Sequence, residues 1–587
     1  MVCHFLSQDH KAAKLNNARN AFVAGIAYGL KKPLLILAHD PYKSPIDYHD
    51  LLKTHRDAPE AVSIFDDWAI FWVKQYTENK KRGDAYKEER TKHAQLLDIY
   101  LGEPVAEHES QRVEEYFVET SSYRESLNAD YSIFVGRRGT GKTATLYKLS
   151  ADIALDPRNH VCAIMPASYE LAGITSLFKS EAKESPNRGY LLESFWKFLI
   201  YTELAKSVYE RILERAPFVS KTSDEAVLCE FVALHQSVIM PEFGIRLETI
   251  VSSLLNLGHP FPSGRERVTE ALHDAMLGNL RRMLGNVLAS KKNVAILIDN
   301  LDKSWTPSSD IDLNGELLLG LLNVGTKIAE EFHRSGSNRQ PVAMKIIVFM
   351  RSDIFGMIRR VAKERDKLPA RYINWNDQEL LLRVIEERFL KAGVEVASRD
   401  EIWERFFPET IRGMRTSSFL VTSIFPRPRD LIVLVKACIE SAINKGHPKV
   451  TESDVLEGCG QYASFAFNAI VVEGAPQVPH LEDILLSFID GPSIVTEYRL
   501  LEIMEEFNPD FDIELFIKLL SELTFLGLEV TRNKFEYAYD PGQDALISQR
   551  AKRTAGVHGE RRFEIHHSFH DLLGLKAAGG PYIELSR

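Results

Sequence analysis

The sequence has little cysteine: five residues among 587, and no pair in C-x-x-C spacing. This excludes a disulfide framework and a cysteine-based zinc site, and it indicates a reducing compartment. Long apolar runs are also lacking. None approaches the roughly 18 residues that cross a bilayer, and no basic stretch followed by an apolar one opens the chain, so we expect a cytoplasmic protein without membrane contact. Internal repeats and low-complexity tracts are not visible, which excludes repeat arrays.

Positive charge is not in excess either. The formal net charge is −10 at pH 7 and the pI is near 6.0, so the chain lacks the basic footprint typical of nucleic-acid-binding proteins. What is present is enough apolar material for cores, because 45% of the residues are hydrophobic and 26% are charged. With one domain per roughly 100–200 residues, the length predicts three or four globular domains.

The stretch FVGRRGTGKTATLYKL, residues 134–149, matches the pattern G-x-x-x-x-G-K-[ST] through Gly136, Gly141, Lys142 and Thr143. It follows the apolar, β-prone YSIFV and precedes residues whose apolar spacing fits a helix. In that context, backbone N–H groups bind phosphate oxygens, the lysine reaches the β and γ phosphates, and the threonine hydroxyl binds Mg²⁺. We therefore predict a phosphate-binding loop (P-loop), the alternative being a glycine-rich turn without a ligand.

A second strand carries the acid that such a loop requires. In KKNVAILIDNLDKSW, the apolar run Val294–Ile298 is typical of a strand buried on both faces, and Asp299 follows it. Asp299 is the predicted magnesium residue, the alternative being a surface acid at the end of an edge strand. Asp302 is the predicted catalytic base, with orientation of its own loop as the equal alternative.

Two further stretches place arginines where they could meet a nucleotide. AMKIIVFMRSDIF is typical of a third buried strand, and it ends at Arg351, which would sense the γ-phosphate or else pair with Asp353. FPRPRDLIVLVKACIESA opens an apolar helix with Arg427 and Arg429, although cations are unfavourable at a helix N-terminus. These arginines indicate a negative partner such as a nucleotide, with a solvated basic turn as the alternative.

Together, GRRGTGKTA, ILIDNLD, VFMRSD and RPRD resemble the motifs of AAA+-like STAND and KAP-type P-loop ATPases over roughly Glu114–Gly460. The resemblance implies a Mg·ATP site between a βαβ core and a helical lid, with Arg351 at the sensor position. Relatives place a second acid directly after the first, where this chain has Asn300, so the identity of the base and hydrolysis itself stay open. The predicted nucleotide contacts are Gly136, Gly139, Thr140, Gly141, Lys142, Thr143, Arg427 and Arg429. The predicted metal contacts are Thr143 and Asp299, and the catalytic candidates are Asp302 and Arg351.

Residues 1–75 alternate short strands and helices in the manner of a flavodoxin-like α/β sheet. They resemble the later half of a TIR-like or nucleoside-deoxyribosyltransferase-like domain, in which an Asn, a small-residue helix, KP with an apolar strand and a P-x-D loop follow in this order. At the helix position of the catalytic Glu in those families the chain has Ala24. Three interpretations stay open: cleavage of NAD or a nucleoside, an inactive nucleotide-binding or protein-binding domain, and a plain α/β unit.

The predicted fold is a multidomain α/β protein whose P-loop core has a parallel sheet. The predicted parts are 1–75, the partial TIR-like unit; 76–112, a charged helical linker; 113–375, the P-loop core with a helical insertion at about 166–290; 376–475, a helical lid; and 476–587, a winged-helix-like domain.

Charge also indicates what the C-terminal domain binds. Between His480 and Leu523 acids far outnumber bases, which opposes phosphate contact and favours a protein partner. A later basic cluster keeps nucleic acid as a weaker alternative: Arg550, Lys552, Arg553, Arg561 and Arg562. His566 and His567 have no cysteine or acid at a ligand spacing, so we expect them to be packing or loop residues rather than metal ligands.

Three functions fit these observations. The first is a Mg-dependent ATPase that acts as a switch or assembly platform and forms homo-oligomers, in bacterial antiviral defence by analogy with its relatives. An arginine of a neighbouring subunit would then complete the site, with Arg359, Arg360 and Arg365 as candidates. The second is an effector enzyme that cleaves NAD or a nucleoside. The third is a non-hydrolysing scaffold that holds its nucleotide.

Overall fold

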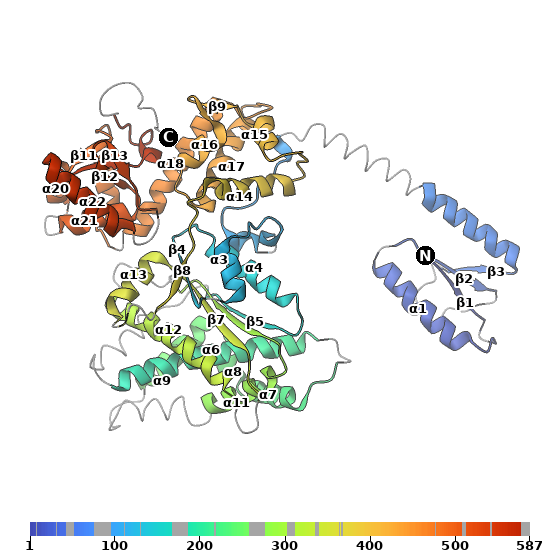
Figure 1. Ribbon diagram of the computed structural model, residues 1–587. Helices are drawn as coiled ribbons and strands as arrows, with labels where there is room; N and C mark the ends of the chain where they lie inside the picture. The colour runs from blue at the N-terminus through green and yellow to red at the C-terminus, as the bar shows by residue number, and fades with distance from the viewer. Residues whose placement is uncertain are drawn as a thin grey trace. The chain divides into compact units, whose positions relative to one another are not determined.

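The structure is a computed structural model of the chain, drawn in Figure 1. It describes residues 1–576 apart from 8, 31, 41, 43–51, 75–95, 111, 130, 167–185, 216–218, 257–275, 302–310, 335–339, 363, 365–367, 476, 508–511 and 540–542. The chain forms two compact units, Met1–Ala94 (unit 1) and Gln95–Arg587 (unit 2). Both mix helices with a parallel sheet, so the predicted mixed α/β class is confirmed.

Unit 1 has a three-stranded parallel sheet in the order β1 (Val2–Phe5), β2 (Leu35–His39), β3 (Leu52–His55). Helix α1 (Ala13–Gly29) packs on one face of it, where its small residues Ala24 and Ala27 let the helix approach the strands closely. Residues 58–74 form a second helix. In Figure 1 the strands lie between the two helices. The TIR-like assignment of this unit stays a prediction.

The core of unit 2 is a five-stranded parallel sheet in the order β5-β6-β7-β4-β8. Its strands are β5 (His160–Ile164), β6 (Val294–Ile298), β7 (Met344–Arg351), β4 (Ile133–Gly136) and β8 (Ala370–Tyr372). Every residue of β6 is buried, as predicted for a strand covered on both faces. Strand β7 lies between β4 and β6, so the chain segments that follow these three strands emerge side by side at one edge.

Helices cover both faces of this sheet (Figure 1). Alternate residues such as Phe134 and Phe349 point to one face, where they pack on α3 (Ser121–Asn128) and α4 (Lys142–Ala154). Their neighbours in each strand point to the other face, because side chains alternate along a strand. That second face packs on α6 (Pro186–Leu213), α11 (Gly278–Leu288), α12 (Ile311–His333) and α13 (Ser352–Val361). The chain segment that connects β5 to β6 also contains α7 (Ser223–Leu234), α8 (Gln236–Ile239) and α9 (Phe243–Asn256).

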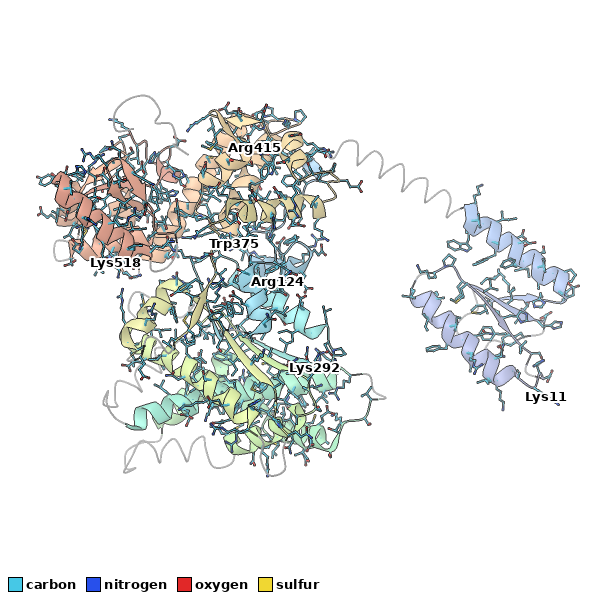
Figure 2. All side chains as sticks on the ribbon, in the orientation of Figure 1. Lys11, Arg124, Lys292, Trp375, Arg415 and Lys518 are labelled. Carbon is cyan, nitrogen blue, oxygen red and sulfur yellow. The ribbon has the colours of Figure 1, made fainter. Side chains whose placement is uncertain are left out.

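Five helices after β8 form a second, helical part of unit 2, which we call the lid. They are α14 (Gln378–Lys391), α15 (Asp400–Phe406), α16 (Thr416–Thr422), α17 (Pro428–Asn444) and α18 (Glu452–Gly474). The short strands β9 (Thr410–Ile411) and β10 (Met414–Arg415) pair between α15 and α16. Figure 2 places Trp375 where the sheet and the lid meet.

The C-terminal part has helices α19 (Leu481–Leu486), α20 (Glu497–Phe507), α21 (Ile513–Glu522) and α22 (Gln543–His558). Its antiparallel sheet has the order β11 (Ile494–Thr496), β14 (Arg562–Ile565), β12 (Leu526–Thr531), β13 (Lys534–Glu536). Strands β12 and β13 pair antiparallel as a hairpin, and their sequence alternates apolar and polar residues. The winged-helix assignment stays a prediction. This part docks on the lid, since Ser568 Oγ donates a hydrogen bond of 2.8 Å to the Ser423 carbonyl.

Residues 96–118, which we call the strap, pack against the lid as part of unit 2. They include three 3₁₀ turns: Leu96–Asp98, Ala106–Glu109 and Val113–Glu115. The Glu109 carboxylate pairs with Arg388 of α14 at 3.2 Å, and Lys436 Nζ of α17 donates to the Gly102 carbonyl at 2.9 Å. Residues 76–112 are predicted from the sequence to be a charged helical linker, and this packing on the lid was not predicted. Among the described helices, none is long and apolar enough to cross a membrane.

Candidate nucleotide-binding site

The loop between β4 and α4 has the backbone of a phosphate cradle. Gly139 and Gly141 have φ of +84° and +87°, the left-handed region that glycine enters without steric cost. Gly141 is the N-cap of α4, so the N-terminus of that helix, with its free N–H groups and partial positive charge, follows directly. At Gly139 space matters as well, because an added Cβ would lie 3.2 Å from Cβ of Arg429 in the lid.

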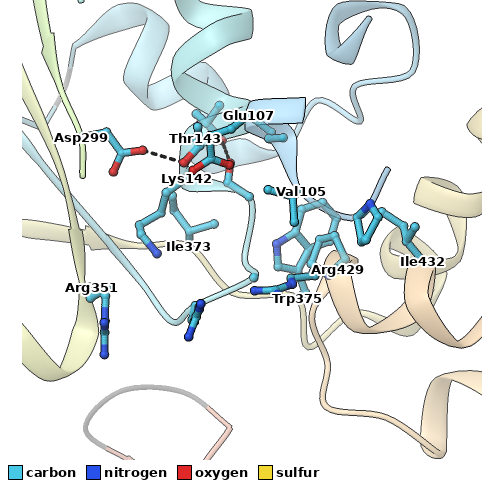
Figure 3. A pocket seen from close by; sticks show the side chains of 18 of the residues that line it. Val105, Glu107, Lys142, Thr143, Asp299, Arg351, Ile373, Trp375, Arg429 and Ile432 are labelled. Atoms are coloured by element: carbon cyan, nitrogen blue, oxygen red, sulfur yellow. Dashed lines mark hydrogen bonds between the residues drawn. The ribbon is translucent and has the colours of Figure 1, made fainter. Parts of the chain in front are cut away.

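Lys142 and Thr143 begin α4 and face the loop and the neighbouring strand end (Figure 3). Lys142 Nζ donates to the carbonyls of Gly136 and Arg137, at 3.0 and 2.9 Å. Thr143 Oγ1 donates to Asp299 Oδ2 at 2.7 Å. Asp299 follows β6 and is 2% exposed, so a buried carboxylate and a hydroxyl stand together. Hard oxygen donors of this kind suit Mg²⁺, and these two residues fit the predicted metal role.

Arg351 ends β7 opposite Gly136 of the P-loop strand, because the two residues are register partners. Its guanidinium forms an ion pair with Asp353 at 2.7 Å, with both side chains about a quarter exposed or less. This ion pair is the predicted alternative to a sensor role for Arg351. Both residues also line the cavity described below, so Arg351 forms the ion pair and lies at the cavity as well.

The two lid arginines occupy different positions. Arg429 lines the cavity, its backbone N–H donates to the Gly139 carbonyl at 3.4 Å, and its guanidinium lies 5.0 Å from the ring centroid of Phe465. Burial lowers the pKa of Arg429, and the charge of Arg138 lowers it further. Arg427 caps α17, is 7% exposed and is not among the residues that line the cavity.

A partly buried carboxyl, Glu473 near the end of α18, also lines the cavity. Four arginine charges act on it: those of Arg427, Arg137, Arg351 and Arg138. Burial alone would raise the pKa of Glu473, but these charges lower it below its ordinary value, so the group is an anion. Arg137 in turn donates a hydrogen bond to the Thr524 hydroxyl of the C-terminal part. The phosphate loop, the lid and the C-terminal part therefore meet here.

The cavity encloses about 510 Å³ and has a charged half and an apolar half. The apolar half was not anticipated from the sequence. Its residues come from the strap, α14, α17 and the segment that follows β8: Val105, Tyr116, Phe117, Val118, Ile373, Trp375, Val384, Pro428 and Ile432. Trp375 Nε1 donates to the Thr140 carbonyl at 3.0 Å and so joins this wall to the P-loop. No local pattern marks these residues, since they gather only through long-range packing.

Asn300, which stands where the ATPases that the sequence resembles have a second acid, also lines the cavity. It is 9% exposed and has a φ of 65°, a left-handed conformation that Asn and Asp tolerate better than other side chains. Asp302, the predicted base, lies outside the described residues. The described acids that line the cavity are Glu103, Glu107, Asp299, Asp353 and Glu473.

Several other predicted residues lie away from this cavity. Arg359 and Arg360 are exposed on the last turn of α13, and Arg365 lies outside the described residues. Four of the five basic residues near the C-terminus are already in ion pairs: Arg550 with Glu536, Lys552 with Glu514, Arg561 with Glu497 and Glu514, and Arg562 with Glu529. This pairing weakens the nucleic-acid alternative, because phosphate would have to displace the acids.

The two adjacent histidines differ in burial, because His566 lies in the core whereas His567 is exposed. His566 is fully buried, and its ring hydrogen-bonds with the Tyr539 hydroxyl at 3.0 Å. His567 hydrogen-bonds with the Thr422 carbonyl of the lid. Within the described part of the chain, no group of three or more His, Cys, Asp or Glu side chains is arranged to hold a metal ion.

Comparison with known proteins gives a family match in the lid and one curated relative. A model described as the FunZ-associated C-terminal helical domain matches residues 379–471. The "Putative transposon gamma-delta 80.3 kDa protein" of Escherichia coli (strain K12) is 20% identical over 363 residues, which are 60% of this chain and 49% of that protein. The chain thus spans about half the length of the curated relative that it matches.

Solved structures similar to this chain include two archaeal ORC proteins and a bacterial motor. The ORC2 protein of Aeropyrum pernix has a TM-score of 0.32 at 13% identity and covers 76% of this chain and 98% of its own. The ORC1 protein of the same organism, in complex with DNA, has a TM-score of 0.32 at 14% identity, and the match covers 82% of this chain and 96% of that protein. The RuvB Holliday junction branch migration motor of Thermotoga maritima has a TM-score of 0.26 at 11% identity, and the match covers 70% of this chain and 89% of that protein.

Proposed function

We propose that this chain binds Mg·ATP in the cavity between the P-loop and the lid and uses the bound nucleotide as a switch. The observation that carries the proposal is one cavity of about 510 Å³ with two chemically different halves. The Thr143–Asp299 pair, Lys142 and the end of α4 supply the charged half, and the strap and Trp375 supply an apolar wall suited to a planar base.

Each charged or polar residue of the cavity has a separate proposed role in binding Mg·ATP. Lys142 exchanges the two backbone carbonyls that it now contacts for the β and γ phosphates, to which it is the better partner because they are anions. Thr143 and Asp299 hold the magnesium ion, which when bound neutralises phosphate charge. Arg351, at the strand end beside the P-loop, and Arg429, from the lid, line the same cavity and would supply further positive charge to the phosphates.

Hydrolysis is expected to be slow. A general base needs a free carboxylate or imidazole within reach of the attacking water, and Asn300 supplies neither. Among the described acids of the cavity, Asp353 is engaged with Arg351, Asp299 accepts a hydrogen bond from Thr143, and Glu103 pairs with Lys436. Glu107 and Glu473 are the described acids that could serve instead. Slow turnover suits a switch, whose nucleotide state must last, and it keeps the non-hydrolysing scaffold as the second candidate.

The switch itself is proposed to run through Glu473. A γ-phosphate would add negative charge among the arginines that now surround this carboxylate, so the two anions would compete for them. One of these arginines, Arg137, also holds Thr524 of the C-terminal part. Binding of a triphosphate would therefore loosen the contact between the P-loop and the C-terminal part, whereas a diphosphate would leave it in place.

The finer assignments rest on resemblance. Membership of the STAND or KAP subtype, assembly into homo-oligomers and a role in antiviral defence are supported by the motif resemblance alone. The name of the curated relative adds a transposon as an alternative setting. Cleavage of NAD or a nucleoside by unit 1 is disfavoured, because Ala24, at the position of the catalytic Glu in the resembling families, is fully buried in the apolar core of that unit.

The test is equilibrium binding of a fluorescent ATP analogue with and without Mg²⁺, followed by phosphate release over a protein concentration series. Lys142→Ala is expected to weaken binding by at least about tenfold, the loss of one charge-assisted contact. Lys148→Ala is the matched control, because Lys148 lies on the same helix and outside the cavity lining. Equal affinity of the Lys142→Ala variant and the wild type would refute nucleotide binding at this loop.

The switch is tested separately with Glu473→Gln. Removing the competing charge is expected to tighten ATP binding and leave ADP binding unchanged. If ATP and ADP affinities change equally, the carboxylate does not compete with the γ-phosphate, even though the cavity still binds nucleotide.

A further inference from the structure

The outer surface of α1 in unit 1 exposes apolar side chains to solvent. Ala24 and Ala27 on its inner face pack against the sheet, so the opposite face points away from the core. That face carries Leu15 (61% exposed), Phe22 (70%) and Ile26 (47%), followed by Leu30. The spacing of seven, four and four residues puts these side chains in one stripe, the α1 stripe. A helix that is apolar on both faces is ordinarily covered on both.

The helix over residues 58–74 repeats this arrangement. Its half-buried residues Ile64, Trp68 and Trp72 recur at helical spacing and define the inner face. Other apolar residues are exposed, and four of them cluster on one side as the second stripe: Val62, Phe65, Ile70 and Val73. The last two are about two thirds exposed, at 67% and 65%. Single exposed apolar residues are ordinary, but two ordered stripes on one small unit indicate a contact surface.

Charge distinguishes the two stripes. Residues 10–39, which include α1, contain lysine and arginine but no acid, whereas residues 57–73 contain four acids and neither lysine nor arginine. Arg19 is exposed beside the α1 stripe, and Asp66 is exposed beside the second stripe. Neither forms an ion pair within the part of the chain that the structure describes. Figure 2 labels Lys11, a further cation at the start of the basic segment.

We propose that the α1 stripe of one copy of this protein packs against the second stripe of another copy, with Arg19 facing Asp66 across the contact. The occupant is a second copy because each unit carries both halves of a complementary pair: apolar with positive charge, and apolar with negative charge. An unrelated partner would need only one of them. In Figure 1 the strands of unit 1 lie between the two helices, so the two stripes face away from each other and cannot both contact the same second copy. The contact is therefore heterologous and joins copies head to tail, in a ring or an open chain.

The first test is charge reversal in the full-length chain, without nucleotide, followed by sedimentation velocity over a concentration series. Arg19→Asp and Asp66→Arg are each expected to weaken self-association by at least about tenfold, because each sets like charges against each other at the contact. The doubly reversed chain, and an equimolar mixture of the two single variants, restore the opposite charges and are expected to recover the wild-type association.

Matched controls lie on the same helices. Lys14→Asp and Asp67→Arg make the same charge changes more than a quarter turn around the helix from Arg19 and Asp66, and they are expected to leave association unchanged. If the single reversals have no effect, or if neither the double variant nor the mixture recovers association, the contact between the stripes is refuted. An isologous contact of α1 with α1 also contradicts it and is distinguishable, since Arg19→Asp alone would then not be rescued by Asp66→Arg.

A cross-linking measurement locates the contact independently of its strength. A chain carrying Phe22→Cys is mixed with one carrying Phe65→Cys under mild oxidation, and the linked peptides are identified by mass spectrometry. We expect a disulfide between these two positions, but none when Tyr28→Cys, which is exposed on another side of α1, replaces Phe22→Cys. Equal yields at positions 22 and 28 would overturn the proposal. The outcome does not depend on nucleotide binding by unit 2.

Discussion

Replacing Glu109 tests whether the strap is held closed over the cavity by one buried ion pair. The Glu109 and Arg388 side chains are 3% and 7% exposed, and their 3.2 Å pair is supplemented by the Tyr116 hydroxyl, which donates to the same carboxylate. Glu109→Ala leaves the guanidinium buried, with the Leu101 carbonyl as an acceptor. Breaking such a pair from one side costs about 3–5 kcal/mol, whereas a surface pair costs at most about 1 kcal/mol.

Glu109→Gln separates charge from shape, because the amide oxygen still accepts from Tyr116 but carries no charge. We expect a smaller loss, of about 1–3 kcal/mol. Arg388→Met combined with Glu109→Leu removes both charges and keeps apolar volume, so this double variant is expected to be less destabilised than the sum of the single changes.

The assay is hydrogen exchange of the backbone amides in residues 96–118, which reports the free energy of local opening in a chain of several domains. Nucleotide affinity is measured in parallel and is expected to fall with strap protection, because the strap forms one wall of the cavity. Protection within about 0.5 kcal/mol of wild type after Glu109→Ala would refute the reasoning, as would additive effects in the double variant.

Three further predictions concern backbone conformation, catalysis and pH. Gly102→Ala should destabilise the strap, because its φ is +76° and an added Cβ would collide with the Glu109 carboxylate; Gly356→Ala, in open space within α13, should be neutral or stabilising in thermal denaturation. Asn300→Asp keeps a residue tolerant of left-handed backbone and adds a carboxylate to the cavity, so phosphate release should rise by about tenfold or more; unchanged turnover would mean that position 300 does not limit the reaction. Burial, and then the charges of Lys291 and Arg211, lower the pKa of His160 from 6.5 to about 4, so folding stability should fall by up to about 3 kcal/mol as the pH drops from 6.5 to 4, and pH-dependent denaturation of His160→Gln should lack that loss.

The parts of the site that are predictable from the sequence are those determined by neighbours in the chain. The P-loop glycines, Lys142 and Thr143 are recognisable because a phosphate cradle requires them at fixed spacing. Strand β6 has the predicted bounds, Val294–Ile298, since an unbroken apolar run before an acid has few other uses. The same local logic explains the β12–β13 hairpin, where a polar turn interrupts an alternating pattern.

What the sequence could not indicate depends on contacts between distant segments. The strap has the composition of a loop, and only its docking on α14 and α17 makes it a cavity wall. No sequence pattern marks Trp375, and its place in the cavity wall follows only from the folded chain, in which its indole N–H donates to the Thr140 carbonyl. The role of Arg351 was left between ligand contact and ion pairing because both use the same geometry at a strand end. The positions of the strap, Trp375 and Arg351 therefore depend on tertiary packing, which local sequence propensity does not encode.

The hydrogen bond between Arg137 and Thr524 has a consequence for biosynthesis. It joins residues 387 positions apart. A ribosome adds about 5–20 residues per second, so roughly 20–80 s pass between the synthesis of these two residues. Over that interval the nascent chain already contains its complete phosphate loop, but Arg137 still lacks its hydroxyl partner. A chain terminated before Thr524 would never form this hydrogen bond, so the surroundings of Arg137 differ between chains with and without the C-terminal part.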